Sequence, residues 1–288
     1  MIIELNAKKI AALENIIKTH DFSTYLGFTS MHRGFEVPNL DNEIKLSVLT
    51  KLSTENWREV PSFISFWKWF KTKHGTHMAK QISRHMFPKD EKFRTYMVNC
   101  MKNKISHDWW DHIKARVYKK WCSILTEMQA VYAVVYGSEK LSLNWHVLAS
   151  AQLDAMGVDF VIIANGKAIP IQVKKDSFHQ QIHHKQNNKE NFSRFDMTKK
   201  ALKLIQAELD KVKMGSVEID KGLLLKYGLP KSGKMAYDYL GHFPNGFVYF
   251  DRIRLVQELE LVINTADEQV EFNFILPSIS VPQVITTH

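Results

Sequence analysis

The chain has 288 residues and a mass of 33.5 kDa, and 45% of its residues are hydrophobic, so it is long enough to bury a substantial core. Its 39 Lys and Arg against 30 Asp and Glu give a net charge of +9, which indicates a polyanionic partner. No apolar run approaches the ~18 residues of a membrane span, and two cysteines, Cys100 and Cys122, have no metal-ligand spacing and argue against a disulfide framework. We therefore expect a cytoplasmic protein.

The N-terminal part of the sequence predicts basic helices. Residues 1–17 have an amphipathic helical pattern and lack the small-residue cleavage site of a signal peptide. Residues 66–122 contain 14 Lys or Arg against 4 acidic residues, together with five of the seven tryptophans. Any single aromatic residue there is explained by packing in a helical core. The basic patch as a whole indicates a surface that binds the DNA backbone. We therefore expect a largely helical, basic DNA-binding domain over residues 1–119.

The C-terminal part predicts an α/β domain over residues 120–288, with a mixed β-sheet flanked by helices. Residues 121–136 have the pattern of a buried helix, and helical patterns follow at 194–213 and 252–264. Short β-rich runs occur at 147–153, 158–164, 167–174, 222–227, 246–251 and 269–276. Residues 176–193 are almost devoid of apolar side chains, which predicts a loop or a segment ordered by a partner.

The most informative feature is a hairpin centred on Asn165-Gly166, a dipeptide that favours a type I′ turn. Counting outward from this turn gives the pairs Ala164/Lys167, Ile163/Ala168, Ile162/Ile169, Val161/Pro170, Phe160/Ile171 and Asp159/Gln172. The last pair is of the open kind, in which side chains approach most closely. Because side chains alternate along a strand, Lys174 should emerge on the same face as Gln172. The hairpin thus predicts three polar groups at its end.

Pro170 tests this register. It falls at an open pair, where its missing N–H would point away from the Asp159 strand. The other neighbour of the Pro170 strand must then lack a donor there or begin beyond it.

A carboxylate, an amide oxygen and an ammonium gathered in this way suit Mg²⁺, which prefers oxygen ligands and binds substrate phosphates. Lys174 could then stabilise the charge that develops on a phosphate, and phosphodiester hydrolysis is the reaction that this set favours. The alternative is a structural polar cluster at a strand end, with Lys174 extending to water.

Asp159, followed after twelve residues by Gln172-Val173-Lys174, resembles the core motif of the PD-(D/E)XK nuclease superfamily. The resemblance covers residues 120–176 and implies a restriction-endonuclease-like core, Mg²⁺-dependent cleavage of DNA and kinship with type II restriction endonucleases. It implies that Asp159 is the metal-binding acid, that Lys174 is the catalytic lysine and that the Val173 carbonyl is a further ligand.

The resemblance also implies a helical glutamate near the metal, for which Glu127 is a candidate and Glu139 a competitor. Two positions depart from the family pattern. Val158 stands where a proline usually precedes the acid, and Gln172 replaces the second carboxylate. Losing a negative charge should weaken metal binding, unless Glu127 compensates.

Two other patterns carry less weight. Residues 228–235 match a phosphate-binding P-loop except at Met235, which cannot supply the hydroxyl that binds Mg²⁺. His179 and His183 have the spacing of a metal pair on one helix face, but their amide-rich surroundings argue against it. These residues and His184 are equally suited to hydrogen bonds with nucleic acid or to a solvated loop.

We therefore expect a type II site-specific deoxyribonuclease that cuts double-stranded DNA as a homodimer. The alternatives are a non-catalytic DNA-binding module and a repair, junction or RNA nuclease of the same fold.

Overall fold

The computed structural model describes residues 2–4, 7–21, 62–86, 109–175, 192–214, 217–228, 237–245 and 247–264. The expected strand at 269–276, the three histidines of 179–184 and nearly all of the P-loop-like segment 228–235 lie outside the described residues.

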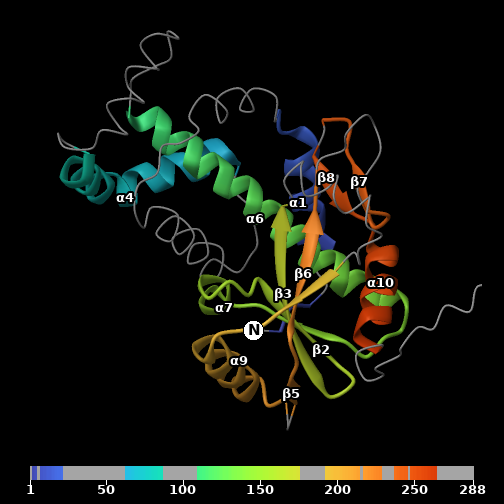
Figure 1. The fold of residues 1–288 in the computed structure, drawn as a ribbon. Coiled ribbons are helices and arrows are strands. Elements are labelled where there is room, and N and C mark those ends of the chain that lie inside the picture. The colour runs from blue at the N-terminus through green and yellow to red at the C-terminus, as the bar shows by residue number, and fades with distance from the viewer. Residues whose placement is uncertain are drawn as a thin grey trace, which may run out of the picture.

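A mixed six-stranded sheet forms the centre of the molecule (Figure 1), which confirms the predicted α/β class. Its strands run in the order β1-β2-β3-β6-β4, and β5 pairs with β3 beside this path. The β3–β6 and β3–β5 pairs are parallel, and the other pairs are antiparallel. The strands are β1 (His146–Leu148), β2 (Phe160–Ala164), β3 (Lys167–Lys175), β4 (Phe192–Phe195), β5 (Glu218–Ile219) and β6 (Gly222–Tyr227).

Helices cover both faces of the sheet (Figure 1). The larger core joins one face to α1 (Ala7–Thr19), α6 (Trp109–Lys140) and α10 (Arg252–Asn264). It also includes the small hairpin of β7 (Leu240–His242) and β8 (Val248–Phe250). On the other face, α7 (Ala151–Ala155) and α9 (Lys199–Lys211) pack over a smaller core. Both faces are therefore buried, as the fully apolar β2 requires.

The predicted hairpin is confirmed over five of its six expected pairs, and beyond them the Asp159 N–H donates to the Ile171 carbonyl. The structure pairs β2 with β3 in the expected register, from Ala164 opposite Lys167 to Phe160 opposite Ile171. Asn165 and Gly166 have φ angles of 51° and 75°, the two positive values that a type I′ turn requires. The Asp159 end of the hairpin is thus fixed by the local turn at its other end.

Pro170 lies where the register argument placed it. The side of β3 away from β2 pairs with β5 at Lys167 and Ala168, and pairing with β6 begins at Ile171. Pro170 occupies the interval between the two partners, so the sheet loses no hydrogen bond to its missing N–H.

Helix caps explain two differences from the predicted elements. The expected strand at 147–153 stops at Leu148, because the Ser150 hydroxyl accepts a hydrogen bond from the Leu153 N–H and starts α7. The expected helix at 194–213 begins only at Lys199, where Thr198 caps α9 in the same way. The residues before that cap form β4, whose Phe192 is buried in the larger core.

The N-terminal elements pack against α6. Phe63 of α4 (Phe63–Met86) contacts Tyr118 and Trp121, with ring centroids 4.7 and 5.7 Å apart, and the Ile3 N–H donates to the Val147 carbonyl beside the sheet. The expected boundary between residues 119 and 120 falls within the continuous helix α6, and the division into two domains stays a prediction. No helix in the described part of the chain is long and apolar enough to cross a membrane.

Candidate active site

Asp159 lies directly before β2 and is bound to β3 through both its backbone and its side chain. Its N–H donates to the Ile171 carbonyl at 2.9 Å, and its Oδ2 accepts a hydrogen bond from the Val173 N–H at 2.7 Å. The carboxylate is therefore held over the end of β3 in a fixed orientation.

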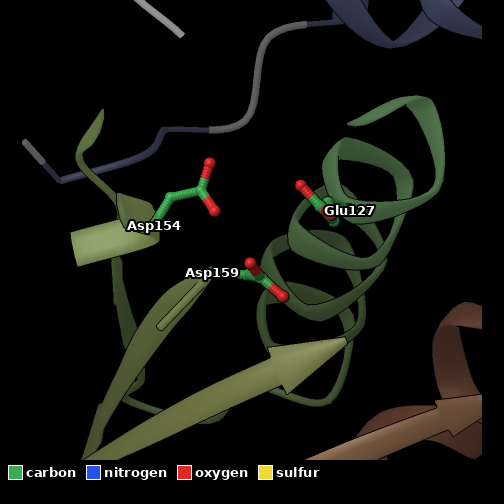
Figure 2. Close-up of side chains that lie close together, drawn as sticks. All are labelled: Glu127, Asp154 and Asp159. Atoms are coloured by element: carbon green, nitrogen blue, oxygen red, sulfur yellow. The ribbon is translucent and has the colours of Figure 1, made fainter. Parts of the chain in front are cut away.

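Three carboxylates converge at this end of the hairpin (Figure 2). Glu127 comes from α6, Asp154 from α7 and Asp159 from the start of β2, and an oxygen of each lies within 4.8 Å of an oxygen of the others. Asp154 is only 3% exposed, and both of its carboxylate oxygens are inaccessible to solvent. Negative charges this close repel one another, and three hard oxygen donors suit Mg²⁺ or Ca²⁺. The donor set therefore fits the divalent cation that the sequence implied.

Glu127 is supported from within α6. The Ser123 hydroxyl, one turn earlier, donates to Glu127 Oε1 at 2.9 Å. Glu139, the competing candidate, is exposed and lies twelve residues farther along the same helix, which is about 18 Å at 1.5 Å per residue. The geometry thus favours Glu127 over Glu139 as a partner of Asp159.

Asp154 is the residue that sequence reasoning missed. The predicted strand ended at residue 153 and gave no direction for the Asp154 side chain. In the structure, the Ser150 cap starts a short helix that directs this side chain inward. The turn at Gly157, whose φ is +83°, then returns the chain to Asp159. An acid in an otherwise apolar stretch, shortly after a good N-cap residue, is the pattern that could have identified it.

Gln172 and Lys174 emerge from β3 on the face away from α6. Val173 belongs to the core that contains α6, and alternation along the strand directs its two neighbours to the opposite face. The Gln172 amide lies near Gly157, where an added Cβ would be 3.4 Å from Nε2, and Lys174 is exposed.

Lys175 returns to the α6 face. Burial raises the pKa of the Cys122 thiol on α6 to about 12, and the nearby Lys175 ammonium offsets part of that rise. The structure thus brings Asp159, Glu127 and the Val173 backbone together, while the participation of Gln172 and Lys174 stays a prediction.

The comparisons with known proteins identify the family of the chain. The family model for the TaqI restriction endonuclease matches residues 10–263. The chain belongs to the TaqI restriction endonuclease family. It is 24% identical over 177 residues to the type II restriction enzyme TaqI of Thermus aquaticus, and the match covers 60% of each chain. No solved structure matches. The expected kinship with type II restriction endonucleases is confirmed, and it extends into the N-terminal region, where the motif gave no indication of it.

Proposed function

We propose that this TaqI-family chain is a Mg²⁺-dependent endonuclease that hydrolyses DNA phosphodiester bonds at specific sequences. The observation that carries the proposal is the convergence of Glu127, Asp154 and Asp159 at the open end of the β2–β3 hairpin. Carboxylate oxygens at this spacing bind a hard divalent cation, and the family is one of restriction endonucleases.

The three carboxylates hold the ion in this proposal, and the Val173 carbonyl and the Gln172 amide oxygen are further candidate ligands. When bound, Mg²⁺ polarises the scissile phosphate and lowers the pKa of a water. The Lys174 ammonium, exposed at the end of β3, stabilises the negative charge that develops on the phosphate oxygens. Asp159 is the best-oriented ligand, because the Val173 N–H fixes one of its oxygens.

Gln172 lacks the negative charge that the family motif has at this position, and Asp154 can supply that charge instead. The family motif places a carboxylate at that position of β3, and an amide there favours the alternative of a silent DNA-binding module. Asp154, buried beside Asp159, restores the missing negative charge from another element. This supports catalysis over binding alone.

We propose double-stranded DNA as the substrate and a homodimer as the active form, because one active site per chain requires two chains to cut both strands. A cytoplasmic location suits a chain with two cysteines in no disulfide pattern. Sedimentation with and without DNA of the recognised sequence tests the dimer, and a species that contains only one 33.5 kDa chain, free or bound to DNA, would contradict it.

The decisive experiment is digestion of a mixed-sequence plasmid with Mg²⁺ and, in parallel, with EDTA. Discrete fragments with Mg²⁺ alone support a site-specific nuclease. Lys174→Ala and Asp159→Ala should each lower cleavage by at least about 100-fold, the scale for losing one charge-stabilising group, while DNA retention on a filter stays near that of the parent protein. If plasmid, branched and RNA substrates all remain uncleaved, the alternative of a non-catalytic DNA-binding module is supported instead.

A matched pair on α6 tests the metal site. Glu127→Gln removes a charge from the cluster, and Glu139→Gln removes the same charge from an exposed position outside it. We expect the first variant to require a much higher Mg²⁺ concentration for half-maximal cleavage and the second to require that of the parent. Equal behaviour of the two would contradict the role of Glu127.

A further inference from the structure

Glu127 reaches the acidic cluster through a long side chain, and its neighbours on α6 and β6 restrict that side chain. The Ser123 hydroxyl donates to Glu127 Oε1 at 2.9 Å, across one turn of α6. Both residues are half-buried. This contact engages one oxygen of the carboxylate on its helix side.

Tyr227 approaches the same place from the sheet. It is the last residue of β6, pairs with Lys175 and packs against the core that contains α6. Burial raises the pKa of Tyr227 most, the charge of Glu127 raises it further, and the nearby Thr126 and Ser123 side chains lower it. Tyr227 therefore lies close to both Glu127 and Ser123.

We propose that Ser123 and Tyr227 are positioning residues that orient Glu127 for metal binding. The serine hydroxyl donates to the glutamate, and Tyr227 lies next to the serine at the end of β6. The two residues thus restrain the carboxylate from the helix side and from the sheet side. The inference rests on the proposed function, because it requires that Glu127 binds the ion.

The physical reason is the entropy of a flexible ligand. Ordering a flexible glutamate side chain costs conformational entropy, and a donor that restrains it before the ion arrives removes part of this cost from binding. Outer hydrogen bonds to metal ligands typically change metal affinity by about 10- to 100-fold when they are removed. Ser123 should have an effect on this scale, and Tyr227, one step farther away, a smaller one.

The test measures Mn²⁺ binding to the purified full-length protein by isothermal titration calorimetry, independently of cleavage. We expect Ser123→Ala to weaken binding by about 10-fold or more, Tyr227→Phe to weaken it less, and Ser123→Thr, which keeps the hydroxyl, to restore most of it. Cleavage by Ser123→Ala should recover at high Mg²⁺ concentration, a recovery that general damage to the fold would not permit.

Ser138→Ala is the matched control. Ser138 is buried on the same helix, but its hydroxyl donates to the Val135 carbonyl, away from the cluster, and its removal should leave Mn²⁺ affinity unchanged. If Ser123→Ala binds Mn²⁺ with the affinity of the parent protein while Glu127→Gln binds it more weakly, the inference about Ser123 is overturned and the metal-dependent function is not. Failure of the parent protein to bind Mn²⁺ would overturn the inference together with the metal-dependent function.

Discussion

The buried carboxylate of Asp154 should destabilise the protein when no cation is bound. It lies within 4.8 Å of Glu127 and Asp159, and like charges at that distance raise the free energy of the folded state. We therefore expect Asp154→Asn to raise the thermal midpoint in EDTA by a few degrees, since ~1 kcal/mol corresponds to ~2–4 °C for domains of about 150–250 residues. The same variant should lose most of the stabilisation that added Mg²⁺ gives the parent protein.

Differential scanning fluorimetry with EDTA and with Mg²⁺ measures both effects. Asp238→Asn is the control, because Asp238 is exposed and outside the cluster, and it should change neither value. A lower midpoint for Asp154→Asn in EDTA would mean that the carboxylate stabilises the fold, which is the opposite of our expectation.

His20 should make the stability of the fold depend on pH. It lies against Tyr118 and Trp121, and burial lowers its pKa, an effect that the charge of Asp21 partly offsets. The unfolded chain therefore takes up a proton near the ordinary value of ~6.5, and the folded chain does so only at lower pH. Stability should fall as the pH drops from about 6.5 toward the folded pKa. His20→Gln should reduce the drop in thermal midpoint between about pH 7.5 and 5.5, and an unchanged drop would assign the acid sensitivity to other groups.

At the scale of elements, the parts of the fold that the sequence predicted are those determined locally. The Asn165-Gly166 turn needs two positive φ angles, which few other dipeptides adopt, so the register of β2 and β3 followed from the turn alone. Helix α10 was predicted at its observed bounds, because its apolar spacing and its length are typical of one amphipathic helix.

The parts that the sequence did not predict depend on single side-chain hydrogen bonds or on tertiary contacts. The Ser150 cap converts an apparent strand into α7, and with that change Asp154 enters the site. The candidate site was therefore predicted without Asp154, from Asp159, Glu127, Gln172, Val173 and Lys174. Asp159 itself was expected beside Gln172, whereas its carboxylate bonds to the Val173 N–H, a contact that register alone does not predict.

The packing of α6 on α10 depends on a glycine. A Cβ at Gly137 would lie 2.5 Å from the Val256 side chain and would overlap the Arg252 carbonyl. Alanine would gain about 1 kcal/mol of helix propensity over glycine, but overpacking against backbone costs about 1–3 kcal/mol or more. We expect Gly137→Ala to lower the free energy of unfolding by roughly 1–2 kcal/mol, measured by urea denaturation.

Glu139→Ala is the control for this substitution, because Glu139 is exposed on the same helix and should change stability by less than about 0.5 kcal/mol. An increase in stability of Gly137→Ala would show that the two helices can separate without cost.

At the scale of the whole molecule, the described lysines of α4 lie outside the acidic cluster. Figure 1 shows α4 beside the N-terminal half of α6, extending away from the sheet. Lys68, Lys71 and Lys73 are exposed on α4, while its Phe63, Phe66 and Phe70 are buried. The aromatic residues of the basic region thus form a core, at least on α4, and the lysines remain at the surface, where they can bind phosphates.

The salt dependence of DNA binding tests whether this basic surface grips DNA. Removing one lysine that binds a phosphate should reduce the slope of log K against log salt concentration by about 0.9. Lys68→Gln combined with Lys71→Gln should therefore flatten the slope by up to about 1.8 and weaken binding to all sequences alike. The matched pair Lys199→Gln and Lys203→Gln removes the same charge from exposed positions on α9, across the sheet from α6, and should have a smaller effect. If the α9 pair flattened the slope and the α4 pair did not, DNA would bind the α9 side of the sheet, and the N-terminal helices would have another role.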